Sequence, residues 1–170
     1  GIHIDSNLKW TSHTSFIYSK ALSRLFYMKL LKRSGVCIDD MLHFFTTVIR
    51  SLLEYACPVW HNSLTKEQSD RIESIQKRAL KIICGTSFID YEQMRYLNKL
   101  PSLSERREFL CKRFFEKSVL SSASCLHYLL PSCRDTNITA KLRNANVYAN
   151  PIVRTNRFQK SFIMYALDNY

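Results

Sequence analysis

The sequence predicts a mainly α-helical fold. Only 3 Gly and 4 Pro occur in 170 residues, whereas an all-β fold needs turn residues every few positions. Two capping boxes open segments whose apolar residues recur at helical spacing. A hydrophobic fraction of 46% is ordinary for a globular protein and argues against wholesale disorder. We therefore expect a helical bundle, preceded by the end of a β-strand and followed by an irregular tail with a short terminal helix.

A strand end and a long helix are predicted at the N-terminus. Residues 1–5 alternate apolar and polar side chains, which is typical of a strand. A strand needs a pairing partner and none precedes this one, so we expect the chain to be a piece of a longer protein or one with a trimmed start. The first helix is predicted from about Thr11 to Lys32, because Thr11 or Ser12 can cap it and Gly35 follows as a stop.

Two further helices follow. The second is predicted to start near Asp39, whose charge together with that of Asp40 suits the positive end of a helix, and to end by Pro58. The third is the clearest element, because residues 65–68 form a capping box and Gly85 is a natural stop. Its apolar residues form one face, which comprises Ile72, Ile75, Ala79, Ile82 and Ile83. Its basic residues lie on the other side and are Lys66, Arg71, Lys77, Arg78 and Lys81.

Shorter elements complete the predicted fold. A short helix introduced by Asp90 is expected over residues 91–98. A second capping box at residues 102–105 opens a helix that reaches about Val119. The inward residues of this helix are expected to be Leu103, Leu110, Cys111 and Phe114. A last helix is predicted at about residues 159–168. The expected organisation is a strand end in residues 1–10, a helical domain in residues 11–120 and an irregular basic tail in residues 121–170.

The charge of the chain favours polyanionic partners. Its formal net charge is +11, from 25 Lys and Arg against 14 Asp and Glu. Nucleic acid is the expected partner, because Lys and Arg that neutralise phosphates release condensed counterions. No apolar run is long enough to span a bilayer and no secretory signal is present. We expect no membrane partner, a nuclear or cytoplasmic location and six reduced cysteines, which contain no CxxC pair.

Patterns for catalysis or metal binding are weak. Asp39 and Asp40 form the only acidic pair, but they precede a helical apolar pattern, so helix capping explains them better than metal-dependent polymerase chemistry. Cys125, His127 and Cys133 have no standard zinc spacing. No nucleophile-elbow glycines or phosphate-cradling loop are present. We therefore predict no catalytic residue and no metal ligand in this chain.

Two stretches resemble one family in order and spacing. Residues 1–13, GIHIDSNLKWTSH, are similar to the LGxxxDxxLxWxxH segment just past the palm of non-LTR (LINE-type) retrotransposon reverse transcriptases. Residues 49–60, IRSLLEYACPVW, resemble the IRPxLEYAxxVW stretch of the same family, and a helix patterned like residues 64–85 follows in both. Two later stretches, at residues 126–131 and 161–167, are similar to the tails of such elements, so the resemblance covers nearly the whole chain.

The resemblance implies a role in an RNA-directed DNA polymerase. The fingers and the palm, with the catalytic aspartates and Mg²⁺, would lie upstream, and this chain would be the thumb and the region beyond it. Its expected partners are the template–primer duplex of RNA and DNA and the fingers and palm of the same polymerase. No cofactor is expected in this chain, and it would not be active alone. Ser51 stands where the family usually has Pro, so the second helix can run on without a bend.

A thumb grips a duplex through phosphates, and this yields candidate residues. The basic residues expected to contact nucleic acid are Lys77, Arg78 and Lys81 of the third helix, then Lys20 and Arg24 of the first, and Lys9 of the first motif. Trp10 and His13 would either touch nucleic acid or anchor the thumb against the palm, and packing is favoured for Trp10. A structural role in thumb and palm packing is favoured for Glu54, Tyr55 and Trp60 as well.

Two other classes of function stay open at this point. One is a non-functional transposon remnant or a helical protein–protein interaction module made from one, which would expose apolar patches. The other is a small zinc module built on the cysteines and histidine of the tail.

Overall fold

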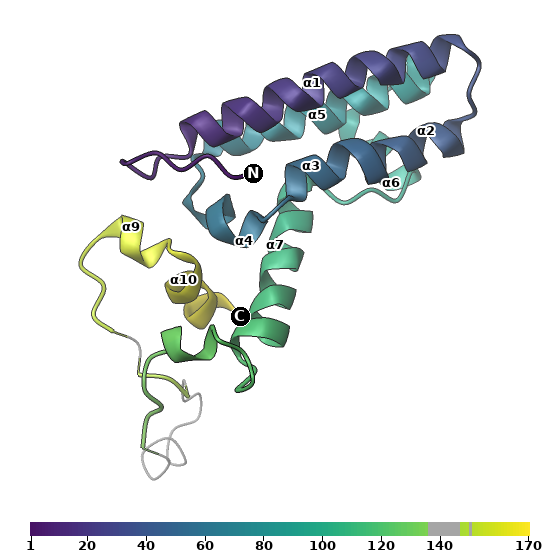
Figure 1. The fold of residues 1–170 in the computed structure, drawn as a ribbon. Coiled ribbons are helices and arrows are strands. Elements are labelled where there is room, and N and C mark those ends of the chain that lie inside the picture. The colour runs from purple at the N-terminus through teal and green to yellow at the C-terminus, as the bar shows by residue number, and fades with distance from the viewer. Residues whose placement is uncertain (136–146, 150) are drawn as a thin grey trace. The chain divides into compact units, whose positions relative to one another are not determined.

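The structure, a computed structural model, describes residues 1–135, 147–149 and 151–170. Its regular secondary structure is helical, which confirms the predicted class (Figure 1). The chain forms two compact units, Gly1–Glu108 and Phe109–Tyr170, and the division falls inside helix α7 (Leu103–Phe114). The sequence instead suggested divisions after residues 10 and 120. The grouping differs because the C-terminal helix packs on residues that directly follow α7.

The first unit is built on two helices, α1 (Thr11–Arg33) and α5 (Lys66–Cys84), which lie side by side (Figure 1). They run in the same direction. At their N-terminal ends Gln68 Nε2 donates to the carbonyl of Lys9 at 3.0 Å, and at their C-terminal ends Lys32 Nζ donates to the carbonyl of Ile83 at 2.8 Å. Because the helices are parallel, the N-terminal half of α1 lies beside the N-terminal half of α5, and the two C-terminal halves lie beside each other.

The predicted strand at the start of the chain is wrong. Residues 1–10 contain no strand, because no extended segment among the described residues lies beside them to complete a ladder. They form a turn that covers the start of α1. Trp10 is the N-cap residue, with φ 60° and no side-chain cap, so neither Thr11 nor Ser12 plays that part. Instead, Asp5 Oδ1 accepts a hydrogen bond from Ser12 Oγ at 2.8 Å.

The second predicted helix is continuous through Ser51 but changes its winding. It comprises α2 (Ile38–Phe44), a π-helical turn η1 (Phe45–Arg50) and α3 (Ser51–Glu54). Arg24 of α1 donates a hydrogen bond to the carbonyl of Val48 inside η1. The helix ends before Ala56, which has φ 50°, and Pro58 lies in the first turn of the short helix α4 (Cys57–Trp60). The predicted end near Pro58 is therefore confirmed.

The predicted caps of the later helices are confirmed. Thr65 and Gln68 form both hydrogen bonds of a capping box at the start of α5. Asp90 caps α6 (Tyr91–Leu97) by accepting from the backbone N–H of Glu92. At α7, Ser102 Oγ accepts from the N–H of Glu105 at 3.1 Å, and the Glu105 carboxylate accepts from the N–H of Ser102 at 2.8 Å. These bonds satisfy backbone donors that a helix start leaves open.

Gly85 ends α5 with φ 56° and ψ −124°, a conformation open essentially to glycine alone. An added Cβ would meet no atom within 4 Å, so the cost of a side chain is purely one of backbone strain. We expect Gly85→Ala to lower the free energy of unfolding by about 1–3 kcal/mol. Thermal denaturation measures the loss. Gly1→Ala, a change at an open terminal position, is the control and should have no effect.

The core of the first unit gathers large apolar side chains from α1, α2, η1, α3, α4, α5 and α7. The largest fully buried ones are Trp60, Phe45, Met28, Met41, Ile49, Leu53, Ile72, Ile75, Leu80, Ile83 and Leu103. The predicted stripe of α5 is confirmed, with Ile82 half-buried at its margin. Short 3₁₀ turns join the helices; these are η2 (His61–Ser63) after α4 and η3 (Gly85–Ser87) after α5.

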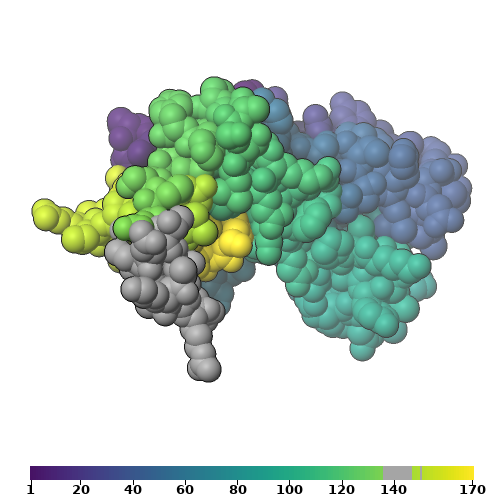
Figure 2. Space-filling view, turned by 90° about the horizontal axis from the view of Figure 1, so that it is seen from below, coloured from purple at the N-terminus to yellow at the C-terminus, as the bar shows by residue number. Residues whose placement is uncertain are grey.

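The second unit is a small helical cluster. After α7 the chain continues through a π-helical turn, and later helices return to it; the elements are η4 (Phe115–Val119), η5 (His127–Leu129), α9 (Asn156–Gln159) and α10 (Phe162–Asn169). Phe115, Val119 and Ala166 form its buried centre, and the yellow C-terminal residues lie against green atoms of the same unit in Figure 2. The predicted inward position of Phe114 is wrong. Its side chain is exposed, because Cys111 and Phe115 occupy the buried side of the helix.

Candidate nucleic-acid interface

A groove runs between the parallel helices α1 and α5. Its volume is about 340 Å³, and its lining consists of Leu22, Leu25, Phe26 and Lys29 from α1 and Arg78, Lys81 and Ile82 from α5. We call this the α1–α5 groove. The groove has an apolar floor, a cationic rim and no acidic side chain among its described lining residues. Such a surface repels other cations and attracts polyanions.

Helical spacing explains how the rim forms. Leu22, Phe26 and Lys29 are separated by four and three residues, so they share one side of α1. On α5, Arg78 and Lys81 are three residues apart and face the same groove. Phe26 exposes 58% of its surface at the edge. Cations about one helical turn apart can contact successive phosphates, while the apolar floor can receive sugars.

The structure brings together only part of the predicted basic set. Arg78 and Lys81 line the groove, whereas Lys77 is exposed on α5 and is not among the lining residues. Lys20 is exposed on α1, where its Nζ lies 4.4 Å from the centroid of the Phe16 ring.

The two remaining basic candidates lie elsewhere. Arg24 is half-buried and donates to the carbonyl of Val48 in η1, which gives its guanidinium a structural contact. Lys9 is exposed in the turn before α1, and its carbonyl accepts the hydrogen bond from Gln68.

Sequence reasoning missed Lys29 as a site residue. Lys29, Lys32 and Arg33 all suit the negative C-terminal end of α1, and nothing in the sequence separates them. In the structure Lys29 lines the groove, whereas Lys32 caps the C-terminus of α5 through the carbonyl of Ile83. Lys29 and Lys32 are distinguished by the side of α1 that each of them occupies. That distinction becomes useful only once α5 is known to be the parallel neighbour.

The basic strip extends along the pair of helices beyond the groove. Arg71 of α5 lies with its guanidinium carbon 4.4 Å from the ring centroid of Tyr18 and donates to Ser15 Oγ at 3.3 Å. This stacked arrangement holds the guanidinium beside α1 while its side chain stays exposed. The α1–α5 surface therefore carries cations along much of its length.

Two sequence motifs meet in the core beneath this surface. Trp10 and His13 are both buried, and their ring centroids are 6.1 Å apart. The His13 ring lies 5.4 Å from the centroid of Trp60, which is fully buried. Trp60 Nε1 donates to the carbonyl of Tyr55 at 3.1 Å. Trp10, His13 and Trp60 thus tie the N-terminal motif to the second motif.

The other two residues expected to pack behave differently. Glu54 is half-buried and its Oε1 forms ion pairs with Arg106 Nε at 3.1 Å and Arg50 Nε at 3.4 Å. It therefore joins α3 to α7. Tyr55 exposes 59% of its surface, so its ring takes no part in the core of the first unit. Its contribution to this core comes through its carbonyl group.

A buried polar group that the sequence did not reveal lies beside Trp60. Arg107 is fully buried, and its Nε donates to His61 Nδ1 at 3.3 Å. His61 Nε2 lies 3.1 Å from Glu108 Oε2 and donates to it. Another guanidinium nitrogen of Arg107 donates to Ser69 Oγ at 3.2 Å. These bonds fix the neutral tautomer of His61 with its proton on Nε2.

The environment of His61 opposes protonation. Burial is the largest cause and the adjacent Arg107 charge the next, while Glu108 acts in the opposite direction; together they lower the pKa of His61 to about 4. Protonation at Nδ1 would also set its N–H against the N–H of Arg107. The group is therefore a structural element that holds together η2, α5 and α7.

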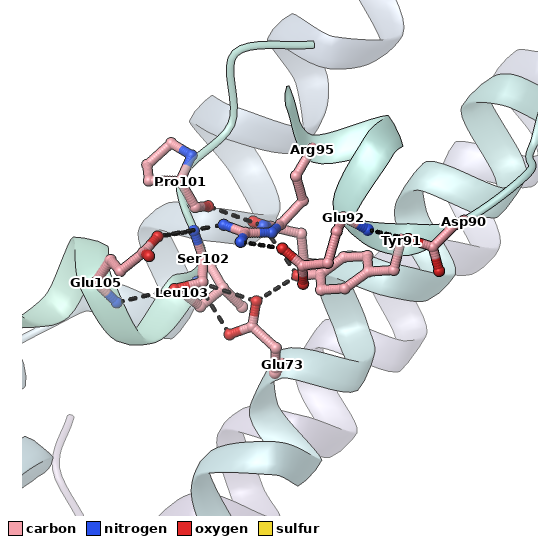
Figure 3. Close-up of polar contacts among 10 residues, drawn as sticks. Glu73, Asp90, Tyr91, Glu92, Arg95, Pro101, Ser102, Leu103 and Glu105 are labelled. Carbon is pink, nitrogen blue, oxygen red and sulfur yellow. Dashed lines mark hydrogen bonds and ion pairs between the residues drawn. The ribbon is translucent and has the colours of Figure 1, made fainter. Parts of the chain in front are cut away.

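Glu73 connects three helices through one carboxylate (Figure 3). Its oxygens accept from the backbone N–H of Leu103 at 3.0 and 3.2 Å, at the positive N-terminal end of α7, and from the hydroxyl of Tyr91 on α6. Burial, followed by these interactions with Glu73, raises the pKa of the Tyr91 hydroxyl. The carboxylate therefore determines how α5, α6 and α7 join.

Removing the Tyr91 hydroxyl tests this junction. We expect Tyr91→Phe to lower the free energy of unfolding by about 1–2 kcal/mol, because Glu73 and Gln76 both lose a partner in a half-buried site. Urea denaturation at neutral pH measures the loss. Tyr96→Phe on the same helix is the matched control, since Tyr96 exposes 85% of its surface. Equal stability of the two variants would contradict this role of Glu73.

The structure shows where the acidic pair of α2 and the cysteines and histidine of the tail, which were considered for metal binding, are placed. Asp39 and Asp40 occupy the first turn of α2, where their charges suit the positive end of the helix, but Cys37 is the N-cap residue and no side chain caps the helix. Asp40 Oδ2 accepts from Cys37 Sγ at 3.2 Å. Cys125 and Cys133 are exposed thiols, and His127 Nδ1 lies 3.2 Å from the carbonyl of Val119. Within residues 1–135, 147–149 and 151–170, no three His, Cys, Asp or Glu side chains are grouped to hold a metal ion.

No helix in the described part of the chain is both long and apolar enough to cross a membrane. Comparison with protein-family models, with curated proteins and with solved structures finds no match for this chain.

Proposed function

We propose that this chain is the thumb and post-thumb part of a non-LTR retrotransposon reverse transcriptase and that it grips the template–primer duplex through the α1–α5 groove. The observation that carries the proposal is the groove itself, where Lys29, Arg78 and Lys81 surround an apolar floor. The two stretches that resemble this family support it independently. Their aromatic residues form one core directly beside the helices that make the groove.

The chemistry of the groove suits a duplex of any sequence. Its cations are matched to phosphates, and none of the described residues that line it is an Asn or Gln of the kind that reads adenine edges. Leu22 and Ile82, which are half-buried, can contact sugars in a shallow minor groove without distinguishing bases. A polymerase needs this type of grip because its product changes sequence at every step.

In this proposal the chemical step belongs to other parts of the polymerase. The fingers and palm would supply the catalytic aspartates and Mg²⁺, and this chain would supply affinity for the duplex. A nuclear or cytoplasmic location and reduced cysteines go with that role. The chain alone is then expected to bind nucleic acid without polymerising it.

Fluorescence anisotropy with an RNA–DNA hybrid of about 20 base pairs tests the proposal across a salt series. We expect affinity to fall steeply with salt, and the triple variant Lys29→Gln, Arg78→Gln, Lys81→Gln to reduce the slope of log K against log salt by about 2–3. The control variant Lys99→Gln, Arg154→Gln, Arg157→Gln removes the same charge from exposed positions that lie outside both α1 and α5. Salt-insensitive binding, or equal effects of the two variants, would contradict the proposal.

A second candidate is a helical protein–protein interaction module. It is favoured by exposed apolar residues around α6, where Ile89, Tyr96 and Leu97 expose 76%, 85% and 68% of their surfaces. Such a patch promotes self-association or partner binding. Sedimentation velocity over a range of concentrations tests it. Association that is removed by Tyr96→Ser with Leu97→Ser supports this candidate, and a monomer at every concentration speaks against it.

A further inference from the structure

A second basic surface lies in the C-terminal unit, on the outer side of α7 and η4. It consists of Phe109, Lys112, Arg113, Glu116 and Lys117, which border a hollow of about 510 Å³. We call it the α7–η4 face. Each of these residues lies three or four positions from another member: Lys112 and Arg113 follow Phe109 at this spacing, Glu116 follows Lys112 and Arg113, and Lys117 follows Arg113. A single helical surface therefore presents all of them.

The opposite side of the same helical segment is anchored. Cys111, Phe115 and Val119 are buried, and Phe115 and Val119 pack against Ala166 and other residues of α10. The Phe162 ring lies 6.3 Å from Phe115, edge to face. Because this packing fixes the rotation of the helix, the α7–η4 face has a defined orientation toward solvent.

The charge of this unit is higher than its size would suggest. Residues 109–170 contain nine Lys and Arg against three Asp and Glu, a net charge of +6 out of +11 for the whole chain. On the α7–η4 face three cations outnumber the single acid. Lys112 Nζ lies 4.0 Å from Glu116 Oε1, and both side chains are half exposed. An ion pair of this kind is weak, so a phosphate can replace the carboxylate as the partner of Lys112.

Phe109 is the one apolar residue among the described lining of this face, whereas Phe26 of the α1–α5 groove borders an aliphatic floor of Leu22, Leu25 and Ile82. Phe109 exposes 53% of its surface and lies one helical turn before Lys112 and Arg113. An exposed aromatic ring in a cationic surface is suited to stack on a nucleobase while Lys and Arg follow the backbone. Bases within a duplex are already stacked on one another, so only an unpaired base can use such a ring.

We infer that the α7–η4 face is a second nucleic-acid site that binds single-stranded RNA or DNA, with Phe109 stacking on a base and Lys112, Arg113 and Lys117 contacting phosphates. Unpaired template extends beyond any template–primer duplex, so a polymerase component meets this ligand together with the duplex. The inference shares no residue with the α1–α5 groove. It can therefore fail or hold independently of the proposed function.

The test uses the full chain and two labelled probes in anisotropy titrations, a single-stranded oligothymidine of about 12 nucleotides and the RNA–DNA hybrid. We expect Phe109→Ala to weaken single-strand binding by about tenfold, and to leave hybrid binding unchanged. Phe158→Ala is the matched control, because Phe158 lies in the same unit and exposes 45% of its surface. It should leave both affinities unchanged.

A charge variant and a reciprocal variant complete the design. Lys112→Gln, Arg113→Gln, Lys117→Gln should lower the salt slope for the single strand by about 2. The groove variant at Lys29, Arg78 and Lys81 should weaken binding of the hybrid and spare the single strand. An oligouridine probe of the same length shows whether the ribose 2′-hydroxyl contributes, and comparable binding of both strands is expected because stacking and phosphate contacts are common to them.

Several results would overturn the inference. One is unchanged single-strand affinity in both α7–η4 variants. A second is an equal loss of hybrid and single-strand binding, which would indicate general electrostatic attraction. A third is a loss with the charge variant but none with Phe109→Ala, which would exclude stacking. Far-UV circular dichroism of each variant verifies that the helical content is retained, so that a loss of binding reports on the face itself.

Discussion

Replacing Trp60 with alanine is expected to lower the free energy of unfolding by about 3–5 kcal/mol. Trp60 is fully buried, and its ring lies beside both His13 and the Arg107 guanidinium, whose carbon is 5.7 Å from the ring centroid. The substitution removes the largest fully buried side chain of the first unit. It also leaves the carbonyl of Tyr55 without the N–H that it accepts from Trp60.

Urea denaturation followed by far-UV circular dichroism measures this loss. Tyr55→Ala is the matched control, because it removes a large aromatic ring from the same stretch of chain at a position that is 59% exposed. The control should cost less than about 1 kcal/mol, as surface substitutions generally do. If Trp60→Ala and Tyr55→Ala cost the same, the two sequence motifs do not meet in a packed core.

The second large effect is a loss of stability in acid. The pKa of His61 is about 4 in the folded protein, against an ordinary value of 6.5. Between these values the unfolded chain binds a proton that the folded chain rejects. The contribution of His61 is therefore complete above pH 6.5 and is lost as the pH falls toward 4, by about 3 kcal/mol in all. Burial also lowers the pKa of His13, which adds to the loss in the same direction.

Denaturation at several pH values between 7 and 4 checks this expectation. His61→Gln should flatten most of the dependence, since glutamine can donate to Glu108 and accept from Arg107 without titrating. His43→Gln, a change at an exposed position on α2, should leave the dependence unaltered. An equally steep loss in the His61→Gln variant would assign the acid sensitivity to other groups.

Local sequence signals identified the helices well. The capping boxes at residues 65–68 and 102–105, the stop at Gly85 and the Asp90 cap all appear in the structure. These features act within one or two helical turns, so the residues that cause them are neighbours in the sequence. The same signals misplaced the cap of α1, where the chain before Trp10 folds back and brings the Asp5 carboxylate to Ser12.

The candidate site was only half visible in the sequence. Arg78 and Lys81 could be chosen because α5 separates its apolar stripe from its basic side. Lys29 could not, because its importance depends on which helix lies beside α1. Arg107 was also hidden, since a basic residue in a charged helix normally faces solvent. Its burial becomes acceptable only where His61 and Ser69 arrive from other elements to satisfy it.

By itself, the sequence of this protein determined the helical class, the ends of most helices and the excess of positive charge, because these depend on composition and on contacts within a few residues. Only the tertiary structure decided which charges share a surface. It set α1 and α5 parallel, which placed Lys29 with Arg78 and Lys81, and it packed α10 on η4, which left Phe109, Lys112, Arg113 and Lys117 facing outward. The physical reason is that helix rotation and pairing are fixed by burial of distant apolar residues, which no local pattern specifies.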